Sequence, residues 1–157
     1  MSNRLNIEQK RAKIAFDFAQ RATESHPFTE GVYAQHFYKA EGYDSNAKKV
    51  PMYIKTNGLG NTLAFMYSKR TKKKKDNSQD VYPGHTNNKK DAWYLIYDQI
   101  RTWLEDEEHS IIAERLKNEP NKELIKHITE LNTDEYRAVT KEVLALFSWI
   151  KRFVKDE

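Results

Sequence analysis

The chain has 157 residues and a formal net charge of +4, with 38% hydrophobic and 32% charged residues. This length and composition predict a single domain with a modest core and a highly solvated surface. The chain has no cysteine, which excludes a disulfide scaffold, a thiolate nucleophile and a cysteine-ligated metal, and fits a reducing cytosol. No stretch has the length and hydropathy of a membrane span or a signal peptide, so we expect a cytoplasmic protein without membrane contact.

Two helices are predicted in the first third of the chain. The first runs from Ile7 to about Thr23 and has a continuous apolar face. The second is expected at 30–43, with Thr29 as its N-cap. Three cations of the first helix share a face that we expect to be solvated: Lys10, Lys13 and Arg21.

The stretch at 48–69 carries the most specific pattern. Two apolar runs at helical spacing flank the polar sequence Asn57-Gly58-Leu59-Gly60. We predict a helix–turn–helix with Asn57, Gly58 and Gly60 as a structural turn, and a β-hairpin starting at Asn57-Gly58 is the alternative. Pro51 fits the first turn of a helix capped by Ser45 or a residue near it, or else marks a kink.

Residues 70–90 contain almost no apolar side chains and predict a mobile basic loop within the domain. Six basic residues lie in Lys69–Lys75, and without them 21 Lys and Arg face 23 Asp and Glu. The overall basicity is therefore weak support for a nucleic-acid partner. The Lys72–Lys75 run could contact RNA phosphates without sequence specificity, but a solvated, variable insertion is the favoured interpretation.

Four further helices are predicted after the loop. The first spans residues 91 to about 108 and ends in the acidic run Glu105–Glu108, which we expect to be a solvated end. A short helix ending near 118–120 follows, then a helix capped by Asn121, and then a long helix capped by Thr133 that continues to about Val154. With no strand and no internal repeat predicted, the fold class is all-α: a single-domain bundle of about six or seven helices over residues 1–157.

The last helix separates apolar from cationic side chains. At 100° per residue, its core side and its cations fall on opposite sides. Leu144 points into the cationic sector and Trp149 into a sector with Glu142, which makes both candidates for contact with a neighbouring molecule. The cationic sector holds Arg137, Lys141, Ser148, Lys151, Arg152 and Lys155.

No arrangement of residues indicates catalysis. The five histidines lack the spacing of metal ligands, and we expect most of them at the surface or at helix caps. Neither a nucleophile elbow nor a Walker loop is present. Amides around Gly58 and Gly60 could bind a phosphate, although a close helix–helix contact is the favoured interpretation. The sequence therefore predicts no enzyme, no metal and no cofactor.

Three blocks of the sequence follow one another in a specific order. The first is the proline-bearing apolar run Val50–Ile54, followed by Asn57-Gly58-Leu59-Gly60 and Thr62-Leu63-Ala64-Phe65. The second is the predicted helix with Trp93, Ile100 and Trp103-Leu104. The third contains Asp134-Glu135-Tyr136-Arg137, Thr140 and Trp149–Phe153. Together the blocks resemble the small helical subunit of type III-B CRISPR RNA-guided effector complexes, the Cmr small subunit, from about residue 10 to 155 with gaps at the loops.

This resemblance implies a non-catalytic RNA-binding subunit of antiviral defence, which stacks along a filament and lines the channel of the guide–target duplex. Its implied partners are CRISPR guide RNA, the complementary single-stranded target RNA, other effector subunits and further copies of itself. RNA cleavage and cyclase chemistry would reside in other subunits. The implied RNA-facing surface is basic, and we expect it to include Lys13, Lys48, Lys49, Lys55, Lys141, Lys151 and Arg152.

Two alternatives remain open at this stage. The cations of the last helix could form a merely solubilising face, or Arg137 and Lys141 could pair with nearby acids. The whole chain could instead be a free-standing DNA-binding or adaptor module, with a helix–turn–helix at Asn57–Gly60. Against that second alternative, the residues from Leu59 to Tyr67 contain no cation and few side chains suited to base contacts.

Overall fold

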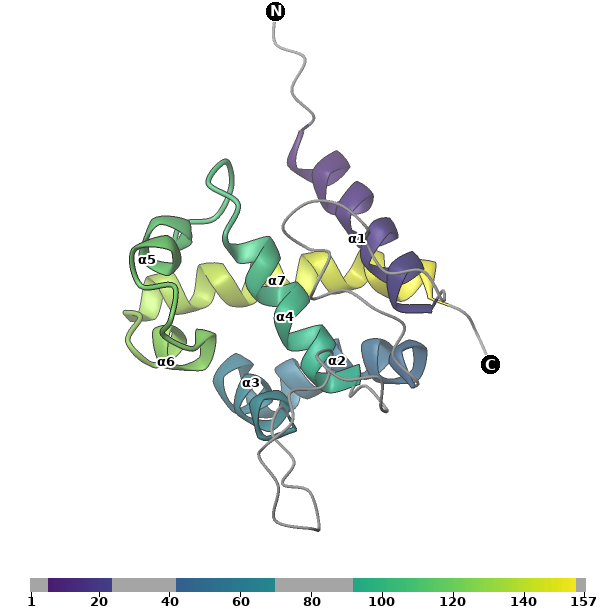
Figure 1. The fold of residues 1–157 in the computed structure, drawn as a ribbon, viewed down its shortest axis with the longest axis horizontal. Helices are drawn as coiled ribbons and strands as arrows, with labels where there is room; N and C mark the ends of the chain where they lie inside the picture. Colours follow the sequence, from purple (N-terminus) through teal and green to yellow (C-terminus); the bar gives the residue numbers. More distant parts are fainter. Residues whose placement is uncertain (1–5, 24–41, 70–91, 155–157) are drawn as a thin grey trace, which may run out of the picture.

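The computed structural model describes residues 6–23, 42–69 and 92–154 (Figure 1). These ranges contain seven helices and no strand, so the expected all-α bundle of six or seven helices is confirmed for this part of the chain. The basic loop expected at 70–90 lies outside the described residues, as does the helix expected at 30–43 except for Gly42 and Tyr43. The helices are α1 (Ile7–Thr23), α2 (Tyr43–Asn57), α3 (Leu59–Ser68), α4 (Ala92–Leu104), α5 (Ala113–Asn118), α6 (Leu124–Thr129) and α7 (Thr133–Phe153).

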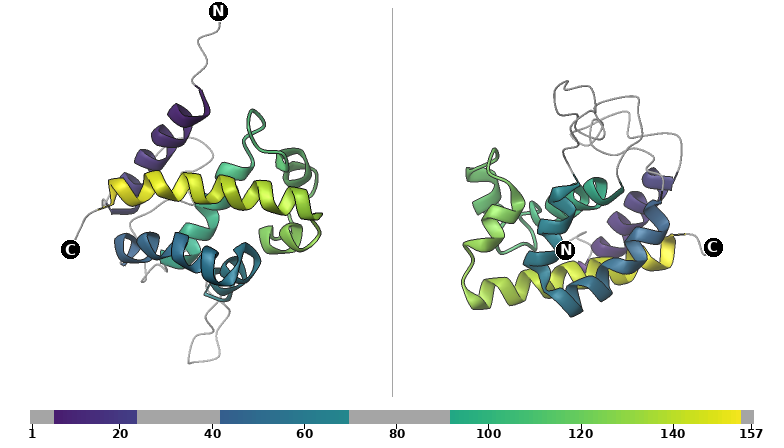
Figure 2. Two further views of the ribbon diagram at one scale, coloured as in Figure 1. Left: turned by 180° about the vertical axis from the view of Figure 1, so that it is seen from behind. Right: turned by 90° about the horizontal axis from the view of Figure 1, so that it is seen from below.

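The longest helix, α7, spans the molecule and organises the other elements. Seen from behind, α7 crosses the full width in front, and α1 and α2 pack along it on opposite sides (Figure 2). The short helices α5 and α6 gather at its N-terminal end, and α4 crosses in front of α7 in Figure 1. One long helix thus contributes to the core and to a long stretch of outer surface.

The core side of α7 is the one that its periodicity predicts. Five apolar residues of this side are fully buried: Val139, Val143, Leu146, Phe147 and Ile150. Phe153, expected on the same side, is 39% exposed and packs edge-to-face on Phe16 of α1. The amphipathic pattern therefore gives the correct face but not the depth of burial at the end of the helix.

Leu144 and Trp149 do not behave as expected. Both are partly buried and pack against the core of their own chain. Trp149 also stacks on Phe153 with ring centroids 6.1 Å apart. Contacts within the chain therefore explain why these two side chains are apolar, and no neighbouring molecule is needed. Helices pack on both flanks of α7, so the buried part of its surface is wider than a single apolar stripe.

Two predicted helix caps are wrong by one or two residues. The N-cap of α7 is Asn132 and not Thr133, because the Asn132 side chain accepts a hydrogen bond of 2.8 Å from the Glu135 N–H. The Glu135 carboxylate accepts in turn from the Asn132 N–H at 3.1 Å, which completes a capping box. Glu123, and not Asn121, precedes the first residue of α6.

Pro51 lies in the interior of α2 and not in its first turn. The helix begins earlier than expected, after Gly42, whose backbone has the left-handed conformation with φ 84°. Ser45 therefore lies inside the helix and does not cap it. Because proline has no N–H, α2 lacks one backbone hydrogen bond at this point. The helix nevertheless continues to Asn57 and packs against α7 and α3.

The acidic run after α4 is exposed at Glu107 and Glu108, as expected, but its carboxylates are also paired with cations. The helix stops at Leu104, and the carboxylates of the following turn form ion pairs with three other elements. Lys10 of α1 pairs with Asp106 and Glu108, and the remaining pairs join Glu105 to Arg101 and Glu107 to Lys117. Lys10 is therefore not on a solvated face, contrary to the expectation for α1.

The two described histidines are also more buried than expected. His127 is fully buried, with Nε2 3.2 Å from the Glu119 carbonyl oxygen. The His109 side chain is 6% exposed and stacks on Trp103 with ring centroids 3.8 Å apart. His109 Nε2 also lies 2.9 Å from the Trp103 carbonyl oxygen. Both rings fill places where the chain folds back, so they serve packing within the described part of the protein.

Candidate nucleic-acid interface

The turn between α2 and α3 lies at Gly58. Its φ of 87° and ψ of 158° fall in a region that only glycine occupies readily. The Gly58 N–H donates to the Ile54 carbonyl at 2.8 Å, and its own carbonyl accepts from the Thr62 N–H and hydroxyl at 3.1 and 2.9 Å. One glycine thus ends α2 and begins α3, so the segment is helical and not a β-hairpin.

Gly60 binds the turn to α7. Its N–H donates to the Tyr136 hydroxyl oxygen at 2.8 Å, and a Cβ at this position would lie 3.4 Å from that oxygen. The amides of both glycines therefore already have acceptors within the chain. This arrangement supports a close helix contact at Asn57–Gly60 and leaves no amide pair there for a phosphate.

The cations singled out from the sequence lie on three helices. Lys48, Lys49 and Lys55 belong to α2, Lys141, Lys151 and Arg152 to α7, and Lys13 to α1. Because α2 and α7 pack along each other, six of these seven cations lie on two neighbouring helices (Figure 2). Lys13 lies on the side of α1 opposite the buried Ala15 and Phe18, which places it away from α7.

Ion pairing divides the described cations into two groups. One group is bound to carboxylates: Lys10, Arg11, Arg101, Arg115, Lys117, Lys122 and Lys126. In the part of the chain that the structure describes, the second group has no ion pair: Lys13, Lys49, Lys55, Arg137, Lys141, Lys151 and Arg152. Most of this second group lies on α2 and α7. The suggestion that Arg137 and Lys141 pair with nearby acids therefore finds no support among the described residues.

Of the three carboxylates of α7, Asp134 is exposed in the first turn, whereas Glu135 and Glu142 are paired with other helices. Glu142 accepts two hydrogen bonds from Arg11 of α1, at 2.7 and 2.8 Å, and one from the Trp103 indole N–H of α4 at 2.8 Å. Glu135 caps α7 and also pairs with Arg115 at 2.9 Å. Both acids are thus neutralised by the rest of the bundle, and the outer side of α7 keeps its positive charge.

The environment of Glu142 shifts the titration of two groups. Burial alone would raise the pKa of Glu142, but hydrogen bonds from Arg11 and Trp103, and the Arg11 charge, hold that pKa below its usual value. Burial also lowers the pKa of His109, and the carboxylates of Glu142 and Asp106 oppose that shift only in part. The ionised carboxylate and the neutral imidazole are therefore the forms that the folded state favours.

The described residues give no sign of a metal centre or of a membrane segment. Among them, no three His, Asp or Glu side chains are grouped so that they could hold a metal ion. None of the described helices is long and apolar enough to cross a membrane. Of the ten residues of α3, none is Lys or Arg, and Leu59, Leu63 and Met66 are buried. This composition argues against α3 as a recognition helix in a DNA groove.

Comparison with known families identifies one family for this chain. A family model described as "CRISPR-associated protein (Cas_Cmr5)" matches residues 7–157. The chain belongs to this family. It is therefore a CRISPR-associated type III-B small subunit, and its family membership implies association with other subunits of an effector complex. The match includes all three sequence blocks on which the resemblance rests, and the free-standing DNA-binding alternative loses its support.

Proposed function

We propose that this chain is a non-catalytic RNA-binding subunit of a type III-B CRISPR ribonucleoprotein in antiviral defence. It stacks with further copies of itself along the filament and lines the channel that holds the guide RNA and its complementary single-stranded target. Guide pairing supplies the sequence specificity, and this subunit contacts the backbone.

The observation that carries this proposal is the unequal pairing of charges. Cations on α1, α4, α5 and α6 are mostly bound to carboxylates, whereas Lys49, Lys55, Lys141, Lys151 and Arg152 have no ion pair among the described residues. All five are exposed and lie on two helices that pack together. Such a surface suits phosphate groups, which bind cations without regard to base sequence.

A pair of charge reversals on α7 tests the proposal. Lys141→Glu with Lys151→Glu should weaken binding of single-stranded RNA, both for the free protein and in the reconstituted complex. The slope of log K against log salt should become shallower by about 0.7 for each single-strand phosphate contact that is lost. Filter binding over a series of salt concentrations measures affinity and slope together.

The matched control is Lys117→Glu with Lys126→Glu, on α5 and α6. It makes the same change in net charge, and both side chains are well exposed, at 49% and 65%. We expect this control to leave the slope unchanged. If the α7 variant enters the complex and binds with unaltered affinity and slope, the RNA lies on another face.

Arg152 and Lys13 need separate variants. The Arg152 guanidinium lies 5.4 Å from the Trp149 ring centroid, so a charge reversal there also removes a packing contact. Arg152→Gln removes the charge with a smaller change in size. Lys13→Glu tests whether RNA contacts the side of α1 that faces away from α7. If this variant binds RNA with unaltered affinity, the interface is restricted to α2 and α7.

A further inference from the structure

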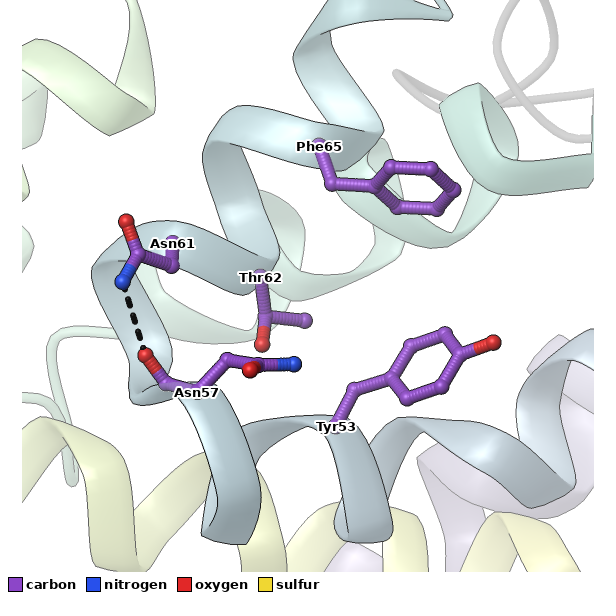
Figure 3. Close-up of a pocket in the computed structure, with 5 residues that line it drawn as sticks. All are labelled: Tyr53, Asn57, Asn61, Thr62 and Phe65. Atoms are coloured by element: carbon purple, nitrogen blue, oxygen red, sulfur yellow. Dashed lines mark hydrogen bonds between the residues drawn. The ribbon is translucent and has the colours of Figure 1, made fainter.

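A pocket of about 290 Å³ lies at the junction of α2 and α3. Figure 3 shows its side chains, with the rings of Tyr53 and Phe65 extending on the same side of the two helices. The volume is at the small end of the range for ligand sites, which suits one planar group rather than a large molecule. The pocket is lined by Tyr53, Asn57, Asn61, Thr62 and Phe65.

The aromatic wall of the pocket is held in place from behind. Tyr53 stacks on Trp93 of α4 with ring centroids 5.7 Å apart, and Phe65 meets the same indole edge-to-face at 5.2 Å. Phe65 nevertheless remains 39% exposed. The wall is therefore both supported and accessible, which is the condition for stacking a base on an aromatic side chain.

The polar side of the pocket has one free amide. The Asn61 side-chain N–H donates to the Asn57 backbone carbonyl at 2.9 Å, which fixes the orientation of Asn61 (Figure 3). The Asn57 side-chain amide is turned toward Tyr53 and makes no hydrogen bond within the described residues. An asparagine amide offers a donor and an acceptor side by side, which matches the polar edge of a nucleobase.

A cation lies over one ring of the wall. Lys69 Nζ, at the end of α3, lies over the Phe65 ring, 5.3 Å from its centroid. None of the described residues that line the pocket carries a carboxylate. An aromatic surface, an unoccupied amide and a neighbouring lysine together are the contacts that proteins use for unpaired bases and their phosphates.

We propose that this pocket binds one unpaired nucleobase of single-stranded RNA. The base stacks on the Phe65 ring, and the Tyr53 ring, which lies at 88° to Phe65, bounds the pocket beside the base. The polar edge of the base meets the Asn57 amide, and Lys69 faces the adjoining phosphate. The proposal rests on the proposed function and adds a base-contacting subsite to it. An aromatic side chain of a protein partner would use the same wall, but it would leave the Asn57 amide unpaired on binding.

The test compares oligoadenylate and oligouridylate with an abasic ribose-phosphate oligomer of equal length, using the full chain. The wild type should bind the base-bearing oligomers more tightly. Phe65→Leu should weaken their binding roughly fivefold to a hundredfold, and Asn57→Ala roughly twofold to tenfold. Neither variant should alter binding of the abasic oligomer, whereas Lys69→Gln should weaken all three.

The two pocket variants differ in their risk of misfolding. Phe65 packs on Trp93, so the result for Phe65→Leu counts only if its thermal melt is unchanged. The Asn57 amide makes no hydrogen bond to a described residue, so we expect Asn57→Ala to leave the fold intact. Asn118→Ala is the control, since this asparagine is exposed at the end of α5. It should bind every oligomer like the wild type.

Each contrary result has a distinct meaning. Equal binding of abasic and base-bearing oligomers by the wild type would overturn the base pocket and leave the phosphate surface of α2 and α7 standing. Failure of the wild type to bind any oligomer, free or in the complex, would refute the proposed function as well. If Phe65→Leu and Asn57→Ala bind RNA normally but no longer enter the complex, a protein partner fills the pocket and the nucleobase is excluded.

Discussion

Glu142→Ala tests whether the contacts of one carboxylate stabilise the packing of α7 on its neighbouring helices. One carboxylate accepts two hydrogen bonds from Arg11 and one from Trp103, so it joins α7 to both α1 and α4. The side chains of Arg11 and Glu142 are only 16% and 15% exposed. Glu142→Ala removes all three acceptor contacts and leaves an indole N–H and most of a guanidinium without partners.

The expected loss can be bracketed from these contacts. Removing one partner of a fully buried ion pair costs about 3–5 kcal/mol. Here the pair is partly exposed, and Arg11 keeps a second carboxylate, Glu8, at 2.7 Å. We therefore expect Glu142→Ala to lower the free energy of unfolding by about 2–3 kcal/mol. For a chain of this size, the midpoint of thermal unfolding should fall by roughly 4–12 °C.

Circular dichroism during heating and urea titration measures both quantities. Glu8→Ala is the control, because it removes a carboxylate from the same arginine at a side chain that is 61% exposed, and it should cost less than about 1 kcal/mol. A double-mutant cycle of Arg11→Ala and Glu142→Ala should give a coupling above about 1 kcal/mol. A loss no larger than that of Glu8→Ala, or a coupling near zero, would refute the role assigned to this contact.

Three further predictions follow from the structure. Gly58→Ala should destabilise the protein by about 1–3 kcal/mol, because Gly58 has a positive φ. Gly60→Ala should be close to neutral, because a gain in helix propensity opposes crowding against Tyr136. Equal losses of stability in thermal melts of the two variants would contradict this difference. Burial lowers the pKa of His109 in the folded state, so the unfolded chain binds more protons below about pH 6.5. Stability measured by urea titration should therefore decline as the pH falls from about 6.5 toward the folded pKa, and His109→Gln should flatten that decline; a pH-independent wild type would show that His109 is not desolvated. The purified protein should not cleave single-stranded RNA with or without Mg²⁺, and cleavage abolished by substitution of one of its own residues would prove otherwise.

Periodicity was sufficient to predict the amphipathic helices but not the contacts that join them. The inward side of α7 follows from spacing alone, because burial of Val139, Val143 and Leu146 recurs every three to four residues. The Arg11–Glu142 and Lys10–Asp106 pairs connect residues 131 and 96 positions apart. No local pattern encodes such separations, so the sequence did not indicate that the acidic run after α4 pairs with cations of other helices.

The misplaced cap of α7 had a signal that could have found it. Both Asn132 and Thr133 are good N-cap residues, so residue type does not choose between them. A capping box needs Glu or Gln three residues after the cap, and only Asn132 has one, at Glu135. Position 136 is a tyrosine, whose hydroxyl is instead used by Gly60.

For the candidate RNA surface, sequence reasoning supplied the residue types and the structure supplied the grouping. The sector of α7 with Lys141 and Lys151 follows from helix geometry. Whether those cations pair with acids depends on the direction in which Glu135 and Glu142 turn, and that depends on Arg115 of α5 and Arg11 of α1. The pocket at Tyr53 and Phe65 likewise depends on Trp93, which comes from a helix remote in sequence.

The division of charge on α7 has a consequence for experiments on binding. Glu142 stabilises the bundle on one flank of the helix, while Lys141 next to it faces solvent about 100° away. Loss of Glu142 should therefore lower stability without changing the salt slope of RNA binding, and loss of the Lys141 charge should change the slope without lowering stability. Adjacent residues with opposite effects would show that one helix serves packing and binding independently. If both substitutions change both quantities, the outer cations depend on the Glu142 contact for their position, and the two sides of α7 act as one unit.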